Sequence, residues 1–131
     1  MADQPLILIV DDDANFREIF GMKLGSEGYR VETAANGEEG VKKVKELKPA
    51  LVLMDVNMPV MDGAAAVLAI RADEDPAVKG VKVAFLTSLG DPRLDMQQLN
   101  IKFSEDFGAQ GYLKKTDDLD VLASHIKSFL A

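Results

Sequence analysis

The side chains that could do chemistry in this 131-residue chain are acids, hydroxyls and amines that directly follow short apolar runs. The runs at residues 6–10, 51–54, 81–86 and 111–113 are followed, in that order, by Asp11-Asp12-Asp13, by Asp55, by Thr87-Ser88 and by Lys114-Lys115. If the runs are parallel strands, their carboxyl ends lie along one edge of a sheet, where sites of open α/β sheets form. We therefore expect these polar groups to meet at one edge.

The acids among these groups need a compensating partner if they converge. Carboxylates that lie close together repel one another, and the repulsion is relieved when the pKa of one acid rises or when a cation binds. A ligand set made only of oxygen atoms suits Mg²⁺, which keeps several waters and takes one or two carboxylates. Asp11, Asp12 and Asp55 are the candidate ligands for such an ion.

The hydroxyl and the amine extend this chemistry to phosphoryl groups. Thr87 and Lys115 would complement a bound phosphoryl group and, together with a metal ion, neutralise the charge that develops during phosphoryl transfer. A carboxylate nucleophile gives an acyl phosphate. It needs no separate base, because an ordinary carboxyl group is ionised at neutral pH.

The elements that must position these groups follow from the apolar patterns. Continuous apolar runs predict buried strands at 6–10 and 51–54, and an alternating run predicts a more exposed strand at 30–34. Largely apolar stretches predict a fourth strand at 81–86 and a short fifth strand at 111–113. Helical spacing lies between them, at 16–24, 41–47, 64–72, 96–107 and 119–130. This alternation predicts an α/β fold with one doubly wound, five-stranded parallel sheet. We expect a single domain over residues 1–131, without an effector domain.

Composition excludes several classes of function. The chain has 15 Lys+Arg against 22 Asp+Glu, a net charge of −7. We therefore expect no direct binding to nucleic acids, because such binding requires clustered Lys and Arg that neutralise phosphates. There is no cysteine, and His125 is the one histidine, so thiol chemistry and His-rich metal sites are excluded. No apolar run is long enough to cross a bilayer, and the N-terminus lacks the features of a signal peptide. We expect a cytoplasmic protein with no membrane partner.

Four segments carry a resemblance to a known family. They are Ile9-Val10-Asp11-Asp12-Asp13, the stretch LMDVNMPVMDG at 53–63, Phe85-Leu86-Thr87-Ser88, and the stretch GAQGYLKK at 108–115. Together they resemble the receiver (CheY-like) domain of bacterial two-component response regulators, and the segment around Asp55 is the most specific. The resemblance covers essentially the whole chain and implies a flavodoxin-like three-layer sandwich.

The resemblance also implies roles for the acids. Asp55 looks like the phosphoacceptor. Asp12 looks like a direct ligand of Mg²⁺ or another divalent cation, Asp11 would hold the metal through water, and the backbone carbonyl of Asn57 would be a further ligand.

Three further residues match the family's switch and phosphoryl-binding positions. Thr87 would bond a phosphoryl oxygen and change rotamer on phosphorylation, Tyr112 matches the aromatic switch position, and Lys115 would pair with the phosphoryl group. Either Lys114 or Lys115 could fill the lysine position. Strand alternation favours Lys115, because it points to the same side as Leu113.

By this resemblance, the protein accepts a phosphoryl group from a sensor histidine kinase or a phosphotransfer protein and then changes a surface that an unknown downstream protein reads. We expect a monomer or a phosphorylation-dependent dimer. It would catalyse its own phosphorylation and dephosphorylation without being a turnover enzyme.

Two features depart from the family pattern. Thr116 stands where the family usually has proline, often after a cis peptide, and a cis bond before threonine would cost about 3 kcal/mol. The spacing from Thr87 to Lys115 is also longer than usual, with the extra residues within Leu89–Leu99. We expect either an extended fourth helix or an added short helix at Asp91–Gln98.

Two other functions remain open at this stage. One is an interaction module that has kept the fold and lost phosphorylation. The other is a Mg²⁺-dependent phosphatase of the haloacid-dehalogenase type, whose acid spacing matches Asp11 and Asp13. Asp13 is otherwise expected to be a helix cap, and His125 a surface or half-buried residue.

Overall fold

The structure is a computed structural model that describes residues 4–55, 63–87, 110–115 and 117–130. Its centre is a five-stranded, fully parallel sheet with the strand order β2-β1-β3-β4-β5. The strands are β1 (Leu6–Val10), β2 (Arg30–Ala34), β3 (Leu51–Asp55), β4 (Lys82–Thr87) and β5 (Gly111–Lys114). All five strands that the sequence predicts are therefore present, with boundaries shifted by one residue at most.

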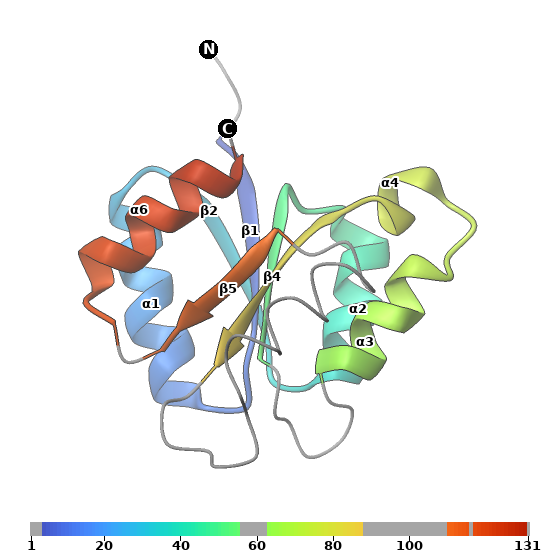
Figure 1. Cartoon of the computed structure of the whole chain (residues 1–131), viewed down its shortest axis with the longest axis horizontal. Coiled ribbons are helices and arrows are strands. Elements are labelled where there is room, and N and C mark those ends of the chain that lie inside the picture. The colour runs from blue at the N-terminus through green and yellow to red at the C-terminus, as the bar shows by residue number, and fades with distance from the viewer. Residues whose placement is uncertain (1–3, 56–62, 88–109, 116, 131) are drawn as a thin grey trace.

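Helices cover both faces of this sheet (Figure 1). The described helices are α1 (Ala14–Ser26), α2 (Gly37–Leu47), α3 (Gly63–Arg71), α4 (Pro76–Lys79) and α6 (Leu119–Leu130). Helices α1 and α6 pack on one face, whereas α2 and α3 pack on the other, with α4 beside α3. The predicted doubly wound α/β sandwich is thus confirmed. The expected helix at 96–107 and the lengthened segment Leu89–Leu99 lie outside the described residues.

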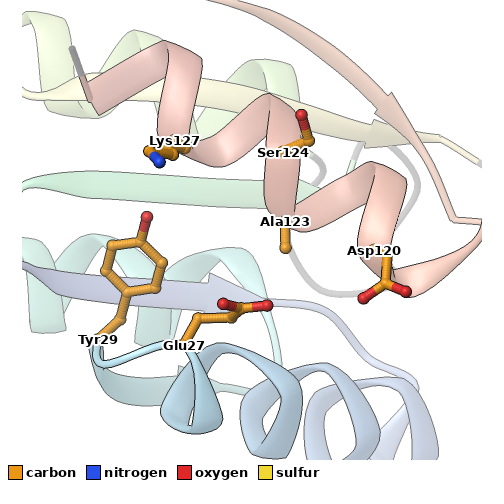
Figure 2. Close-up of a pocket in the computed structure, with 6 residues that line it drawn as sticks. All are labelled: Glu27, Tyr29, Asp120, Ala123, Ser124 and Lys127. Carbon is orange, nitrogen blue, oxygen red and sulfur yellow. The ribbon is translucent and has the colours of Figure 1, made fainter.

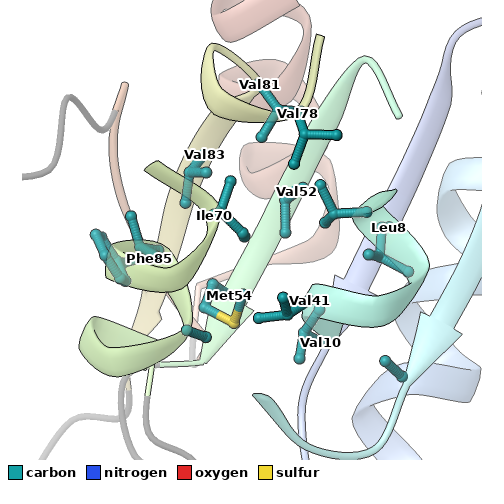
Figure 3. Packing of buried hydrophobic residues seen from close by; sticks show 14 residues of the cluster. Leu8, Val10, Val41, Val52, Met54, Ile70, Val78, Val81, Val83 and Phe85 are labelled. Carbon is teal, nitrogen blue, oxygen red and sulfur yellow. The ribbon is translucent and has the colours of Figure 1, made fainter. Parts of the chain in front are cut away.

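Two apolar cores fill the space between the sheet and its helices, one on each face. Side chains alternate across a strand, so Leu8 and Val10 of β1 face α2 and α3, whereas Ile7 and Ile9 face α1 and α6. Figure 3 shows the core on the α2–α3 side, where Val52 and other strand residues meet the helices. The sheet is covered on both faces, which explains why β1 and β3 are apolar throughout and why the polar groups come after the strands.

Short polar side chains begin the helices. As predicted, Asp13 caps α1, and its carboxylate accepts hydrogen bonds from the backbone N–H groups of Asn15 and Phe16 at 3.0 and 3.3 Å. Helix α6 begins in a similar way, since the carboxylate of Asp118 accepts the N–H of Asp120 at 2.9 Å.

The sequence analysis missed the short helix α4. Asp75 caps it by accepting the N–H of Ala77, and Pro76 occupies its first turn. The backbone hydrogen bond from Ala77 and the contact with Lys48 hold the pKa of Asp75 below its usual value. An acid followed by proline was the available signal for this helix. The sequence analysis did not use this signal at Asp75 because a helix of four residues shows no apolar period.

Within the described residues, no helix combines the length and the apolar character needed to cross a membrane.

The close packing of α2 against β1 gives a test of this fold. A Cβ added at Gly40 would lie 2.9 Å from both γ-carbons of Val10, a fully buried and β-branched side chain that cannot turn away cheaply. We expect Gly40→Ala to lower the free energy of unfolding by about 1–2 kcal/mol, because overpacking exceeds the gain in helix propensity. Denaturant unfolding measures this change.

Gly25→Ala is the matched control, since a Cβ at Gly25 meets nothing within 4 Å. This change within α1 should leave stability unchanged or raise it by up to about 1 kcal/mol. Equal effects of the two substitutions would contradict the close contact between α2 and β1.

Candidate functional site

Four strands deliver polar residues to one edge of the sheet, at the carboxyl ends of β1, β3, β4 and β5. Asp11 follows β1, Asp55 ends β3, Thr87 ends β4, and Lys115 follows β5. Because β1 pairs with β3, β3 with β4, and β4 with β5, these four ends are consecutive neighbours. The parallel arrangement thus brings together residues that are up to 104 positions apart in sequence (115 − 11).

Three carboxylates form the centre of this site. Asp11, Asp12 and Asp55 each offer an oxygen atom, and these atoms all lie within 4.8 Å of one another. Asp11 is fully buried and Asp55 is 5 % exposed, whereas Asp12 is open to solvent. Such a cluster of oxygen ligands, with one open side, suits a divalent cation that keeps part of its water shell.

The backbone fixes Asp11 firmly. Its N–H donates to the carbonyl of Ala34 at 3.1 Å, and its own carbonyl accepts from a guanidinium nitrogen of Arg17 at 2.7 Å. One carboxylate oxygen, Oδ1, accepts the N–H of Asp13 at 2.8 Å. The other oxygen, Oδ2, is buried and has no oriented hydrogen bond among the described residues. This oxygen faces the ammonium of Lys115.

Lys115 supplies a positive charge to these acids. Its Nζ lies 2.7 Å from Asp11 Oδ2 and 3.7 Å from Asp55 Oδ2, and only 13 % of its side chain is exposed. The N–H of Lys115 donates to the carbonyl of Thr87 at 2.8 Å, which holds the start of the loop beside β4. The structure therefore places Lys115 among the acids, while Lys114 is the last residue of β5.

Burial and charge act in opposite directions on this lysine. Burial by itself would lower the pKa of Lys115, but the contact with Asp11 and the attraction of the nearby carboxylates outweigh it. The pKa is therefore raised above its usual value, and the ammonium stays charged at physiological pH.

Thr87 lies beside this group with its hydroxyl turned toward β5. The residue is 1 % exposed, and Oγ1 donates to the carbonyl of Leu113 at 3.3 Å. Tyr112 lies in β5 opposite Phe85 of β4, but its side chain is outside the described part of the structure. Asn57 and Thr116 also lie outside the described residues.

Two residues near the site have contacts that the sequence analysis missed. Arg17 binds the carbonyl of Asp11, and the ring of Phe16 lies under the ammonium of Lys115, 4.8 Å from Nζ to the ring centre. Their positions in the first turns of α1, directly after the acids, were the available signal. Helical spacing identified Phe16 only as a core residue.

A separate hollow lies between α6 and the segment after α1 (Figure 2). Its volume is about 340 Å³, and Glu27, Tyr29, Asp120, Ala123, Ser124 and Lys127 line it. The carboxylates of Glu27 and Asp120 both pair with Lys23. None of the residues gathered at the sheet edge lines it, so the acidic cluster remains the candidate site.

Comparison with known proteins agrees with this geometry. Residues 7–127 match the model of the response regulator receiver domain. The chain belongs to this family. The resemblance noted from the sequence and the expected fold class are therefore confirmed, and this chain is a receiver domain of the response regulator type. Receiver domains of this type interact with histidine kinases or phosphotransfer proteins.

Similar proteins include one of nearly the same length. The sporulation initiation phosphotransferase F of Bacillus subtilis is 32 % identical over 124 residues, which cover 95 % of this chain and 92 % of that protein. The dual master transcriptional regulator RpaA of Synechocystis is 31 % identical over 126 residues, which cover 96 % of this chain and 49 % of the regulator. The chain spans about half the length of RpaA and of several other curated regulators that it matches.

Solved structures show the same architecture. The chemotaxis protein CheY4 of Vibrio cholerae superposes with a TM-score of 0.82 at 29 % identity and covers 97 % of this chain and 99 % of its own. A putative response regulator of Chloroflexus aurantiacus gives a TM-score of 0.82 at 30 % identity, with 98 % of both chains covered.

The pairing of Lys115 with a buried acid predicts a stability effect. Lys115→Met would leave the Asp11 carboxylate buried without its cation, so we expect the metal-free protein to lose about 1–3 kcal/mol of unfolding free energy at neutral pH. The raised pKa of Lys115 means that this contribution is present in full below the pKa of an unfolded lysine and is lost as pH rises through the folded value.

Lys114→Met is the matched control, and thermal or denaturant unfolding of both variants is the measurement. Lys114 lies next in the chain, in β5, and forms no ion pair with the acids among the residues that the structure describes, so we expect a change within about 0.5 kcal/mol. If Lys115→Met were as stable as wild type, the ion pair would contribute nothing to the fold.

Proposed function

We propose that this receiver domain accepts a phosphoryl group on Asp55, with Mg²⁺ or another divalent cation bound beside it. The observation that carries the proposal is the convergence of three carboxylates within 4.8 Å, with the Lys115 ammonium 3.7 Å from Asp55. The donor would be a sensor histidine kinase or a phosphotransfer protein. The family supports this class of donor.

Each residue of the site has a defined part in the transfer. A carboxylate oxygen of Asp55 forms the new O–P bond as the P–N bond of a donor phosphohistidine breaks, and the donor keeps the electron pair of that bond. Lys115 stabilises charge on the phosphoryl oxygens, and the Thr87 hydroxyl would donate to one of them. Asp11, Asp12, Asp55 and the carbonyl of Asn57 would hold the metal ion, which supplies further charge neutralisation.

The hydroxyl of Thr87 connects this chemistry to the surface. In the structure it donates to Leu113 of β5, so it must leave that carbonyl to reach a phosphoryl group on Asp55. Its movement would free space beside β5, where Tyr112 is the candidate second switch residue. A downstream protein would read the resulting change, and the domain would act as a monomer or a phosphorylation-dependent dimer in the cytoplasm.

Two alternatives are outcomes of the same test. The family match disfavours a phosphatase of the haloacid-dehalogenase type, in which the nucleophile follows the first strand. A phosphorylation-independent interaction module would keep the fold without the chemistry. We propose that the protein is not a turnover enzyme.

The decisive measurement is intact mass after incubation with a small acyl phosphate, with and without Mg²⁺. We expect one added phosphoryl group in wild type, dependent on the metal, and none in Asp55→Asn, which keeps the side-chain shape but is a poor nucleophile. No adduct in any sample would favour the phosphorylation-independent module. Continuous release of phosphate would favour the phosphatase.

Thr87→Val tests the hydroxyl separately. The change conserves volume and keeps β4 buried, but removes the donor for the phosphoryl oxygen. Because hydrogen bonds to charged groups contribute about 1.5–3 kcal/mol, we expect the affinity for beryllofluoride, an anionic phosphoryl mimic, to fall about 10- to 100-fold. Thr33→Val, in strand β2, should leave this affinity unchanged. Equal affinities of wild type and Thr87→Val would exclude the proposed role of Thr87.

A further inference from the structure

The ammonium of Lys115 has an aromatic ring as one of its neighbours. Its Nζ lies over the face of Phe16, 4.8 Å from the ring centre, while the carboxylates of Asp11 and Asp55 take up other directions around it. A cation at this distance is attracted by the negative face of the ring, and the attraction grows when water is excluded. The low exposure of Lys115, 13 % of its side chain, meets that condition.

The ring itself is held in place. Phe16 packs against the core on the α1–α6 side of the sheet, and its ring centre lies 5.3 Å from that of the fully buried Phe20. Phe16 also contributes one of the N–H groups that the Asp13 cap accepts. The start of α1 thus fixes the ring, and it directly follows the chain that carries Asp11 and Asp12, so one short segment sets the position of the ring relative to these two acids.

A lysine needs such support more than an arginine would. Its ammonium is a point charge on a long flexible stem, and nothing in its own geometry directs it. If only the acids held the ammonium of Lys115, water would compete with the carboxylate of Asp11 for it. The ring of Phe16 holds the ammonium near both Asp11 and Asp55 through a contact that is not directional. The ammonium can therefore shift between the two acids without breaking a hydrogen bond to the ring.

We propose that Phe16 is a positioning residue for Lys115: its ring face holds the ammonium where it meets a phosphoryl group on Asp55. The inference rests on the proposed function, because it assigns Phe16 a part in the same reaction. Phe16 acts through Lys115 and does not itself contact the phosphoryl group. Removing the aromatic face should therefore weaken phosphoryl binding more than metal binding, since Phe16 offers no ligand to the metal.

A fluorination series separates the ring's charge distribution from its bulk. Mono-, di- and trifluorophenylalanine at position 16 weaken the negative ring face step by step with little change in size. At saturating Mg²⁺ we expect beryllofluoride affinity to fall progressively, by about five- to tenfold for the trifluoro variant, in keeping with the energy of a partly desolvated cation–π contact. The Mg²⁺ affinity measured without beryllofluoride should stay within about twofold.

Phe20 provides the matched control. It lies on the same helix, touches Phe16 and is buried, but within the described part of the chain no cation lies over its ring. The same fluorinated residues at position 20 should give no graded loss of beryllofluoride affinity. A flat series at position 16, or equal slopes at both positions, would overturn the role of Phe16.

A second readout needs no phosphoryl group. The ring current of Phe16 should shift the proton resonances of the Lys115 ε-methylene upfield in the ligand-free protein, and Phe16→Leu should abolish the shift while Phe16→Tyr keeps it. An unshifted resonance in wild type would remove the contact on which the inference stands. If the shift is present but wild type binds no beryllofluoride, the proposed function fails and the contact is only structural.

Discussion

The repulsion among three carboxylates at one edge of the sheet is the constraint on which the rest of the site depends. Asp11 is fully buried, and its charge is compensated by the ammonium of Lys115 at 2.7 Å and by the N–H of Asp13. A buried charge without such partners would cost several kcal/mol. Lys115 therefore provides a resident positive charge that holds these acids together.

The parallel sheet makes this compensation possible. Strands β1, β3 and β4 are buried on both faces, which forces polar residues to the strand ends, and the parallel direction brings those ends to the same edge. The acids come from β1 and β3 and the lysine from β5, so β4 lies between the opposite charges. Thr87 ends β4, and its hydroxyl donates to the carbonyl of Leu113 in β5. The hydroxyl therefore lies between the acids and the strand that carries the lysine.

Much of this could be predicted from the sequence because its signals are local. Apolar runs identified four strands and an alternating run identified the fifth, and the polar residues after the apolar runs identified the acids and the two candidate lysines. The helix α4 was missed because four residues show no helical period. The contacts of Phe16 and Arg17 depend on the direction in which α1 leaves β1, and composition or spacing does not reveal that direction.

The ammonium of Lys115 lies at unequal distances from the carboxylates of Asp11 and Asp55. The ammonium lies 1.0 Å closer to Asp11 than to Asp55 (3.7 − 2.7), so the buried acid is its main partner. A cation bound by Asp11 would weaken that attachment, and a phosphoryl group on Asp55 would add charge on the other side. Both events would draw the ammonium away from Asp11 and toward Asp55, while the ring face of Phe16 remains beneath it. The buried acid Asp11 would thus keep a positive charge beside it in either arrangement.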